Sequence, residues 1–368
     1  MEEADRNVNG KTRTIVAALL ALMLVLAFVP GCTTEKESDS DEPTNGDNGA
    51  EEPTTDVKAA MITDTAGLGD KSFNDLTWQG FEQAEDELGV QVEVLESATI
   101  NDYESNLDQL ALAEYSPLVA TGFMLTDTVS KVAPLYPDTM FINIDGFFDP
   151  VPPNVVGVGF KENEGSYLAG VVAGLATIDT FDERLNDQNV IGFVGGMDVP
   201  LIRKFQAGFE AGAKSVNPDI KVIALYTGSW SDVAKGKELG LSLIEQGADV
   251  IYAAAGGCGE GTVRACQEKG ALFIGVDADQ YNTIANSGDV MLTSMMKNID
   301  VVVFDLIKAM VDDEFPAGTM QVFGLKEGGV GLAPWHDFDS KVPQSIKDAV
   351  DKATDDIISG AVTVPEAL

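Results

Sequence analysis

Apolar and polar positions along most of the chain alternate between two periods, one typical of buried strands and one typical of helices. From Ala59 to Phe81, an apolar run closes on Asp64, a glycine-bearing loop follows, and apolar positions then recur at helical intervals from Phe73. Short, fully apolar runs suit parallel strands covered on both faces, and the later spacing favours an amphipathic helix. This stretch predicts a strand, a loop and a helix, with Asp64 at the carboxyl end of the strand.

The same alternation continues towards the C-terminus. The further strands that we expect are 90–95, 117–120, 140–144, 155–160, 190–194, 220–226, 250–255, 272–276, 290–296 and 320–324. The further helices that we expect are 101–115, 126–133, 162–178, 200–216, 232–246, 299–311 and 343–360. Strands separated by helices of this length indicate right-handed βαβ units and parallel sheets, so the fold class is α/β.

A polar segment, 179–189, interrupts the alternation and precedes a second copy of the same architecture. We place a lobe boundary there, because the chain is too long for one core of ordinary size. The last elements are too few for a third domain, so they must complete the two sheets by crossing between lobes more than once. The predicted N-terminal lobe is 57–180 with about 297–315, and the predicted C-terminal lobe is 186–296 with about 318–368.

The N-terminal region has the pattern of an export signal. Three basic residues precede an apolar run, 15–29, which is shorter than the about 20 residues that a membrane span needs. The run is followed by Pro30, Gly31 and Cys32, which resemble the lipobox of prokaryotic lipoproteins. We therefore expect a signal peptide over 1–31 and lipid attachment at Cys32. The segment 32–56 has no large apolar residue after the cysteine, so we expect a disordered acidic tether.

Charge and composition exclude several classes of function. The formal net charge of −37 makes nucleic acid an improbable partner, because binding phosphates needs a basic surface. The acidity is consistent with ordinary solubility and with a high-salt habitat, and both interpretations stay open. The glycine-rich run Gly256 to Gly261 lacks the lysine and hydroxyl residue of a phosphate-binding loop, so no cofactor is expected. The single histidine, His336, argues against a zinc site.

The predicted strands end in similar ways. Polar, aromatic or glycine residues stand at seven strand ends, which are Asp64, Gly122-Phe123, Asp145-Gly146, Gly195-Gly196, Gly228 to Trp230, Gly256-Gly257 and Asp277. If two sheets face each other across their carboxyl ends, these loops line one cleft. From spacing alone, Phe73 and Asp64 serve equally well as a ligand grip or as a helix staple and a loop cap. Ser72 and Asp75 have the spacing of a capping box.

Four segments carry a resemblance to a known family. They are Thr63 to Asn74, Phe160 to Gly170, Gly275 to Gln280 and Thr293 to Lys297. In these segments the chain resembles the basic membrane protein (Bmp) family of lipoproteins, which includes the purine-nucleoside receptor A type of substrate-binding protein of ABC importers. The resemblance implies a type I periplasmic-binding-protein fold, with two doubly wound parallel-sheet lobes, three crossovers and a ligand cleft between the lobes.

The resemblance also implies roles at the base of a bound nucleoside. Phe73 corresponds to an aromatic residue that stacks on the purine, and Trp230 falls where a second aromatic residue closes the sandwich from the other lobe. Asp64 and Asn74 correspond to groups that form hydrogen bonds with the base. Each aromatic face that stacks on the base contributes about 1 to 3 kcal/mol by analogy with nucleic-acid binders, while carboxylates select N–H and O–H donors.

The resemblance also implies roles at the sugar of a bound nucleoside. Asp277 and Lys297 correspond to groups that bind the ribose hydroxyls, and Asp145 and Gly256 correspond to other ligand contacts. The implied protein is a monomer on the extracytoplasmic face of the cell membrane, anchored through the lipid on Cys32. It would capture a purine nucleoside or a related small molecule and deliver it to an ABC permease and its ATPase, without catalytic or metal-binding residues.

Two other functions stay open. A nucleoside-cleaving hydrolase would use Asp64, Asp145 and Asp277 as acid, base or calcium ligands. These aspartates lie at separate strand ends rather than in a dense cluster, and hydrogen bonding to a ligand accounts for them without chemistry. A surface receptor that senses its ligand and signals through a partner would have the same fold and the same site.

Overall fold

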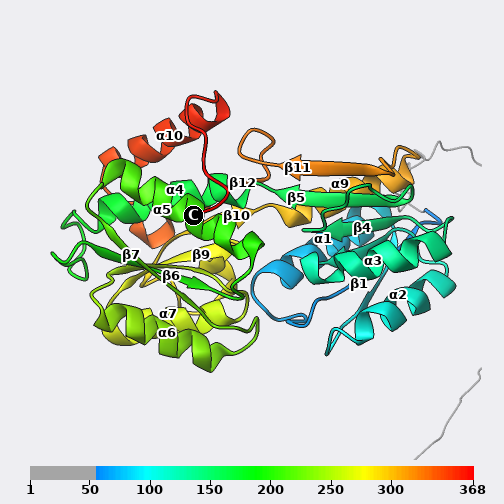
Figure 1. Ribbon diagram of the computed structural model, residues 1–368, viewed down its shortest axis with the longest axis horizontal. Helices are drawn as coiled ribbons and strands as arrows, with labels where there is room; N and C mark the ends of the chain where they lie inside the picture. The colour runs from blue at the N-terminus through cyan, green and yellow to red at the C-terminus, as the bar shows by residue number, and fades with distance from the viewer. Residues whose placement is uncertain (1–54) are drawn as a thin grey trace, which may run out of the picture. The chain divides into compact units, whose positions relative to one another are not determined.

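The computed structural model describes residues 55–368. The predicted signal peptide, the predicted lipid-attachment residue Cys32 and nearly all of the predicted tether lie outside the described residues. The described chain forms two six-stranded sheets, each covered by helices (Figure 1). Within residues 55–368, no helix combines the length and apolar character that a membrane crossing requires.

The first sheet has the strand order β11-β5-β4-β3-β1-β2, and all of its pairs are parallel. Its strands are β1 (Lys58–Ile62), β2 (Gln91–Leu95), β3 (Leu118–Thr121), β4 (Phe141–Ile144), β5 (Val155–Phe160) and β11 (Thr319–Phe323). The helices that cover it are α1 (Phe73–Leu88), α2 (Asp102–Leu112), α3 (Thr126–Val132) and α9 (Ile299–Val311). This sheet and its helices form the first lobe.

The second sheet has the order β12-β10-β9-β8-β6-β7, in which only β12 runs antiparallel to its neighbour. Its strands are β6 (Val190–Gly195), β7 (Lys221–Tyr226), β8 (Val250–Ala254), β9 (Leu272–Asp277), β10 (Met291–Lys297) and β12 (Val330–Leu332). The helices of this second lobe are α4 (Glu162–Ala176), α5 (Pro200–Val216), α6 (Val233–Glu245), α7 (Cys258–Lys269), α8 (Gln280–Thr283) and α10 (Gln344–Ile358).

The alternation of strands and helices predicted from the sequence is confirmed. The central strands β4, β5, β6 and β8 are buried at every residue, as expected for parallel strands covered on both faces. The predicted helices 200–216 and 299–311 match α5 and α9 at both ends. The short strand β12 was not predicted, because three residues carry too little periodicity.

The chain crosses between the two lobes three times, and the crossings correct the predicted lobe assignment. The first crossing is at Lys161, between β5 and α4, because α4 packs on α5, β8 and β10 of the second lobe. The predicted boundary at 179–189 is therefore too late. The other crossings follow β10 and β11, and β11 pairs with β5 in the first sheet. Its assignment to the C-terminal lobe from about residue 318 was wrong.

Helices α4 and α5 approach closely because glycines face the contact. A Cβ atom at Gly170 would overlap the backbone of Phe209, and a Cβ atom at Gly212 would overlap the carbonyl of Tyr167. Such positions tolerate no side chain unless the helices move apart. This packing holds α4 on the second lobe immediately after the first crossing.

We expect Gly212→Val to lower the free energy of unfolding by about 3 kcal/mol, because the added side chain has to push α5 away from Tyr167. Urea unfolding followed by circular dichroism measures the change. Lys214→Val is the matched control, since Lys214 is an exposed position of the same helix and should cost less than about 1 kcal/mol. Equal effects of the two substitutions would contradict the close helix contact.

Candidate functional site

A cleft lies between the two lobes at the carboxyl ends of their strands. It contains about 530 Å³ of empty space, counting the part open to solvent. All eight residues predicted to bind a ligand line it, namely Asp64, Phe73, Asn74, Asp145, Trp230, Gly256, Asp277 and Lys297. The structure therefore brings the predicted residues together, while their contacts with a ligand stay predictions.

Asp70 organises the start of α1 and is not among the residues predicted from the sequence. Its buried carboxylate accepts hydrogen bonds from the backbone N–H groups of Ser72, Asn74 and Asp75, at 3.0, 2.9 and 3.2 Å. The predicted capping box was wrong, because the hydroxyl of Ser72 makes no bond to its own helix. It donates instead to Oδ2 of Asp277 in the other lobe, at 2.6 Å.

Asn74 is fully buried, and its amide is already bonded within the protein. Its Nδ2 donates to Asp64 Oδ1 at 2.9 Å and to Asp70 Oδ2 at 3.0 Å, and its Oδ1 accepts from the backbone N–H of Asp64 at 3.3 Å. Both amide hydrogens are thereby used. This geometry favours a role in which Asn74 orients Asp64, so that Asp64 is the group at this end that meets a ligand.

Asp64 keeps one oxygen available. Its Oδ1 accepts from Ala66 and Asn74, whereas no donor reaches its Oδ2 within residues 55–368. Gly122 leaves the space beside that oxygen empty, because a Cβ there would lie 3.5 Å from Oδ2. Burial raises the pKa of Asp64 to about 6, although its hydrogen bonds with Ala66 and Asn74 act in the opposite direction.

Lys297 stands at the end of β10, is fully buried and is the only basic residue lining the cleft in the described chain. Its Nζ lies 2.7 Å from each carboxylate oxygen of Asp145 and 3.2 Å from Oε1 of Glu162. Burial opposes its charge, but the carboxylates of Asp145, Glu162 and Asp277 outweigh burial and raise the pKa of Lys297. Asp145 and Lys297 thus form an ion pair at the second end of the cleft.

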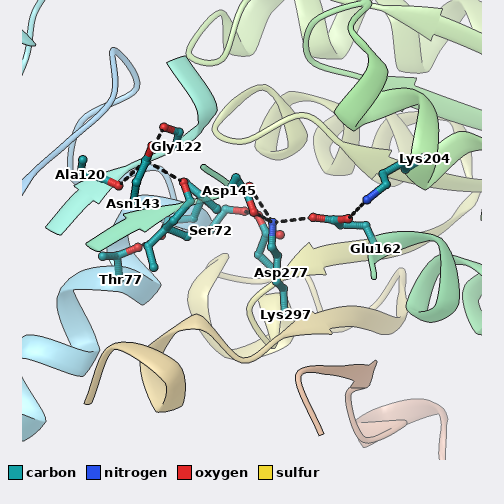
Figure 2. A network of polar contacts seen from close by, with 12 residues as sticks. Ser72, Thr77, Ala120, Gly122, Asn143, Asp145, Glu162, Lys204, Asp277 and Lys297 are labelled. Atoms are coloured by element: carbon teal, nitrogen blue, oxygen red, sulfur yellow. Dashed lines mark hydrogen bonds and ion pairs between the residues drawn. The ribbon is translucent and has the colours of Figure 1, made fainter. Parts of the chain in front are cut away.

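A row of alternating charges continues behind this pair (Figure 2). Glu162, the first residue of α4, is completely buried, and its Oε2 lies 3.5 Å from Nζ of Lys204 on α5. Burial raises the pKa of Glu162 and also those of Asp145 and Asp277, because each carboxyl is removed from water. Glu162 had been noted only as part of the family resemblance, since its position behind Lys297 depends on the fold.

Aromatic side chains from both lobes line the cleft. Phe73 begins α1, and the centroid of its ring lies 5.0 Å from Nζ of Lys297. Trp230 follows β7 and rests on Gly196, where any side chain would overlap the indole ring. Its ring packs against the edge of Phe123, with centroids 6.5 Å apart. Its Nε1 is buried without a hydrogen-bond partner in the described residues, so it is an unused donor.

Further apolar lining was missed by the sequence analysis. Leu201, Ile202 and Phe205 come from the first turns of α5 and complete the wall beside the aromatic rings. Helical periodicity marks them as apolar but does not distinguish a core position from a cleft position. The cleft as a whole combines flat apolar faces, acceptors on four aspartates and one paired lysine. Such a surface offers flat apolar faces and hydrogen-bond acceptors to a small ligand.

The fold and the cleft define a class of protein, the two-lobed solute-binding proteins of the type I periplasmic-binding fold. A solved solute-binding protein of an ABC transporter system from Aeropyrum pernix is similar, with a TM-score of 0.77 and 27% identity, over 84% of this chain and 94% of that chain. A second such protein, from Conexibacter woesei, has a TM-score of 0.67 and 25% identity, over 84% of this chain and 99% of that chain.

The chain belongs to the Bmp family, described as "ABC transporter substrate-binding protein PnrA-like", whose model matches residues 57–367. A protein from Lactococcus lactis named "ABC transporter nucleoside-binding protein BmpA" is 36% identical, over 96% of this chain and 99% of its own length. An uncharacterised lipoprotein from Pyrococcus furiosus is 35% identical, over 88% of this chain and 76% of its own length. The family resemblance seen in the sequence is confirmed.

We expect Asp64→Asn to stabilise the protein at pH 7. Between the ordinary carboxyl pKa of 3.8 and about 6, the folded chain binds a proton that the unfolded chain has released. The stability contributed by this group therefore falls as pH rises through that range, by up to about 3 kcal/mol. Chemical unfolding of wild type and variant at pH 4 and pH 7 measures the difference.

The difference in unfolding free energy between Asp64→Asn and wild type should be near zero at pH 4 and largest at pH 7. Asp127→Asn, at an exposed position of α3, is the control for the loss of one negative charge and is measured at the same two pH values. A stabilisation that is the same at both pH values would contradict the raised pKa of Asp64.

Proposed function

We propose that the protein binds a purine nucleoside in the cleft and delivers it to an ABC permease. The observation that carries the proposal is the placement of Phe73 and Trp230, one from each lobe, around a cleft whose polar lining is mainly carboxylate. A purine offers two flat faces to such rings, and its N–H groups and the sugar hydroxyls match the acceptors.

The charge of the cleft supports a nucleoside over a nucleotide. Four aspartates line it, and Lys297 is already paired with Asp145 and Glu162. A phosphate would meet several carboxylates at short range without a free cation, which is electrostatically unfavourable. The name of the Lactococcus lactis relative, a nucleoside-binding protein, agrees with this preference.

The hydrogen bonds between the lobes support a mechanism of capture by closure. The carbonyl oxygen of Lys71 accepts from Gln280 Nε2 at 3.2 Å and from Thr283 Oγ1 at 3.1 Å, beside the bond from Ser72 to Asp277. These bonds form only when the lobes are close together. A ligand that contacts both lobes adds to them and shifts the population towards the closed state, which a permease can recognise.

The membrane location follows from the same proposal. Relatives from Pyrococcus species are named lipoproteins, and the predicted signal peptide with Cys32 gives this chain the corresponding pattern. We therefore place the protein on the extracytoplasmic face of the cell membrane, as a lipid-anchored monomer.

We expect Phe73→Ala and Trp230→Ala each to weaken nucleoside binding tenfold or more, which corresponds to about 1.4 kcal/mol of lost stacking. Isothermal titration calorimetry with inosine, adenosine and guanosine measures the change. Trp78→Ala is the matched control, because Trp78 is an aromatic residue of the same helix that stacks on Phe81 outside the cleft. Unchanged affinity in both cleft variants would refute the aromatic sandwich.

A nucleoside hydrolase is the rival from another class, and a product assay separates it from a binding protein. Prolonged incubation of the purified protein with the same three nucleosides should release no free base, as measured by liquid chromatography. Native mass spectrometry of the protein as purified should in turn reveal a retained nucleoside. If the wild-type protein steadily releases free base and the Asp64→Asn variant does not, the protein is a hydrolase and the binding proposal is refuted.

A further inference from the structure

A second hollow adjoins the cleft, and we call it the outer chamber. It contains about 1150 Å³ of empty space, including the part open to solvent, and it shares Phe123, Asp145 and Leu201 with the cleft. The rest of its wall is formed by Phe147, Val199, Pro200, Lys204, Glu366 and Ala367. These residues come from both lobes and from the C-terminal segment, which descends from α10 towards α5 (Figure 1). The shared residues make the outer chamber a continuation of the cleft.

The C-terminal segment is held in place at this wall. Val364 is buried, and its carbonyl oxygen accepts a hydrogen bond of 3.0 Å from Nδ2 of Asn163, next to the first crossing. Glu366 and Ala367 follow directly and line the chamber. The part of the outer chamber's wall that the C-terminal segment forms is therefore held in place by burial and by a hydrogen bond.

The chemistry of the cleft indicates which end of a nucleoside faces the chamber. A base edge presents donors to an acceptor such as Asp64, whose amide neighbour Asn74 is fully engaged. Sugar hydroxyls also donate, and the neighbouring carboxylates of Asp145 and Asp277 offer acceptors to an adjacent pair of them. Since Asp145 also lines the outer chamber, the sugar lies at the opening between the two spaces.

The residues that line the outer chamber determine which chemical groups can bind in it. Phe123, Phe147 and Pro200 give it apolar faces, and Phe147 is 50% exposed although it is a large aromatic residue. Among residues 55–368, Lys204 is the only basic residue of its lining, and its Nζ lies 3.5 Å from Oε2 of the buried Glu162. With Asp145 and Glu366 also present, the lining disfavours a phosphate and favours an uncharged apolar group.

We propose that the outer chamber is a subsite for an uncharged apolar substituent on the 5′ carbon of the bound nucleoside. The 2′ and 3′ hydroxyls form an adjacent pair of donors suited to the carboxylates of Asp145 and Asp277, which leaves the 5′ carbon to point outward. This proposal rests on the proposed nucleoside binding. It widens the substrate class from nucleosides to their 5′-thioether derivatives and excludes 5′-phosphates.

Calorimetry on the purified protein tests the subsite. The probes are adenosine and guanosine, each with its 5′-deoxy-5′-methylthio derivative and its 5′-monophosphate. We expect each thioether to bind within about threefold of its parent nucleoside, and each monophosphate to bind at least a hundredfold more weakly. If a parent binds while its thioether is a hundredfold weaker, the subsite is refuted and the nucleoside function stands. If no nucleoside binds, both proposals fail.

Variants of the chamber separate its contribution from that of the cleft. Phe147→Ala should weaken the thioethers about fivefold and leave the parent nucleosides within twofold, because Phe147 lines the chamber and not the cleft. Ala367→Trp should fill the chamber from the exposed tail and have the same selective effect. Leu135→Ala, at a position that is 69% exposed and lines neither space, is the control. Equal losses for parent and thioether in both chamber variants would overturn the proposal.

Discussion

The buried ion cluster of Lys297, Asp145 and Glu162 is the interaction on which the arrangement of the site depends. A lysine that is 1% exposed is stable only when carboxylates replace its hydration. Lys297 ends β10 just before the second crossing, Glu162 begins α4 just after the first, and Asp145 belongs to the first lobe. The cluster therefore connects these two crossings to the cleft, and the geometry at this end of the cleft depends on the positions of the lobes.

The opposite end of the cleft is organised in another way. There the carboxylates of Asp64 and Asp70 share the amide of Asn74, and Asp70 also caps α1. The ion pair of Lys297 and Asp145 therefore organises one end of the cleft. The amide of Asn74, between the carboxylates of Asp64 and Asp70, organises the other end. Both arrangements leave carboxylate oxygens near the aromatic rings while keeping the lining rigid, because each side chain is fixed by more than one contact.

Much of this could be predicted from the sequence, because strand and helix periods are local. Six of the seven polar strand ends line the cleft as predicted, whereas Gly195 and Gly196 do not line it and Gly196 lies against the ring of Trp230. The resemblance in four segments indicated which side chains meet there. The roles of Glu162 and of the α5 lining could not be predicted, because they depend on which loops face each other. The role of Asp70 is local, but the spacing of Ser72 and Asp75 indicated a different capping pattern. The lobe boundary was misplaced for a similar reason. The polar segment 179–189 is a loop within the second lobe, whereas the true crossing at Lys161 is short and has no distinctive composition.

The place of β11 has a consequence for how the protein is made. The edge strand of the first sheet comes from residues 319–323, although the rest of that sheet is complete by residue 160. Helix α9, which packs against α1, is also supplied late in the chain. The sheet of the first lobe therefore cannot be completed until most of the second lobe has been synthesised. Contacts of such long sequence separation slow folding, so the edge of this sheet is expected to form late.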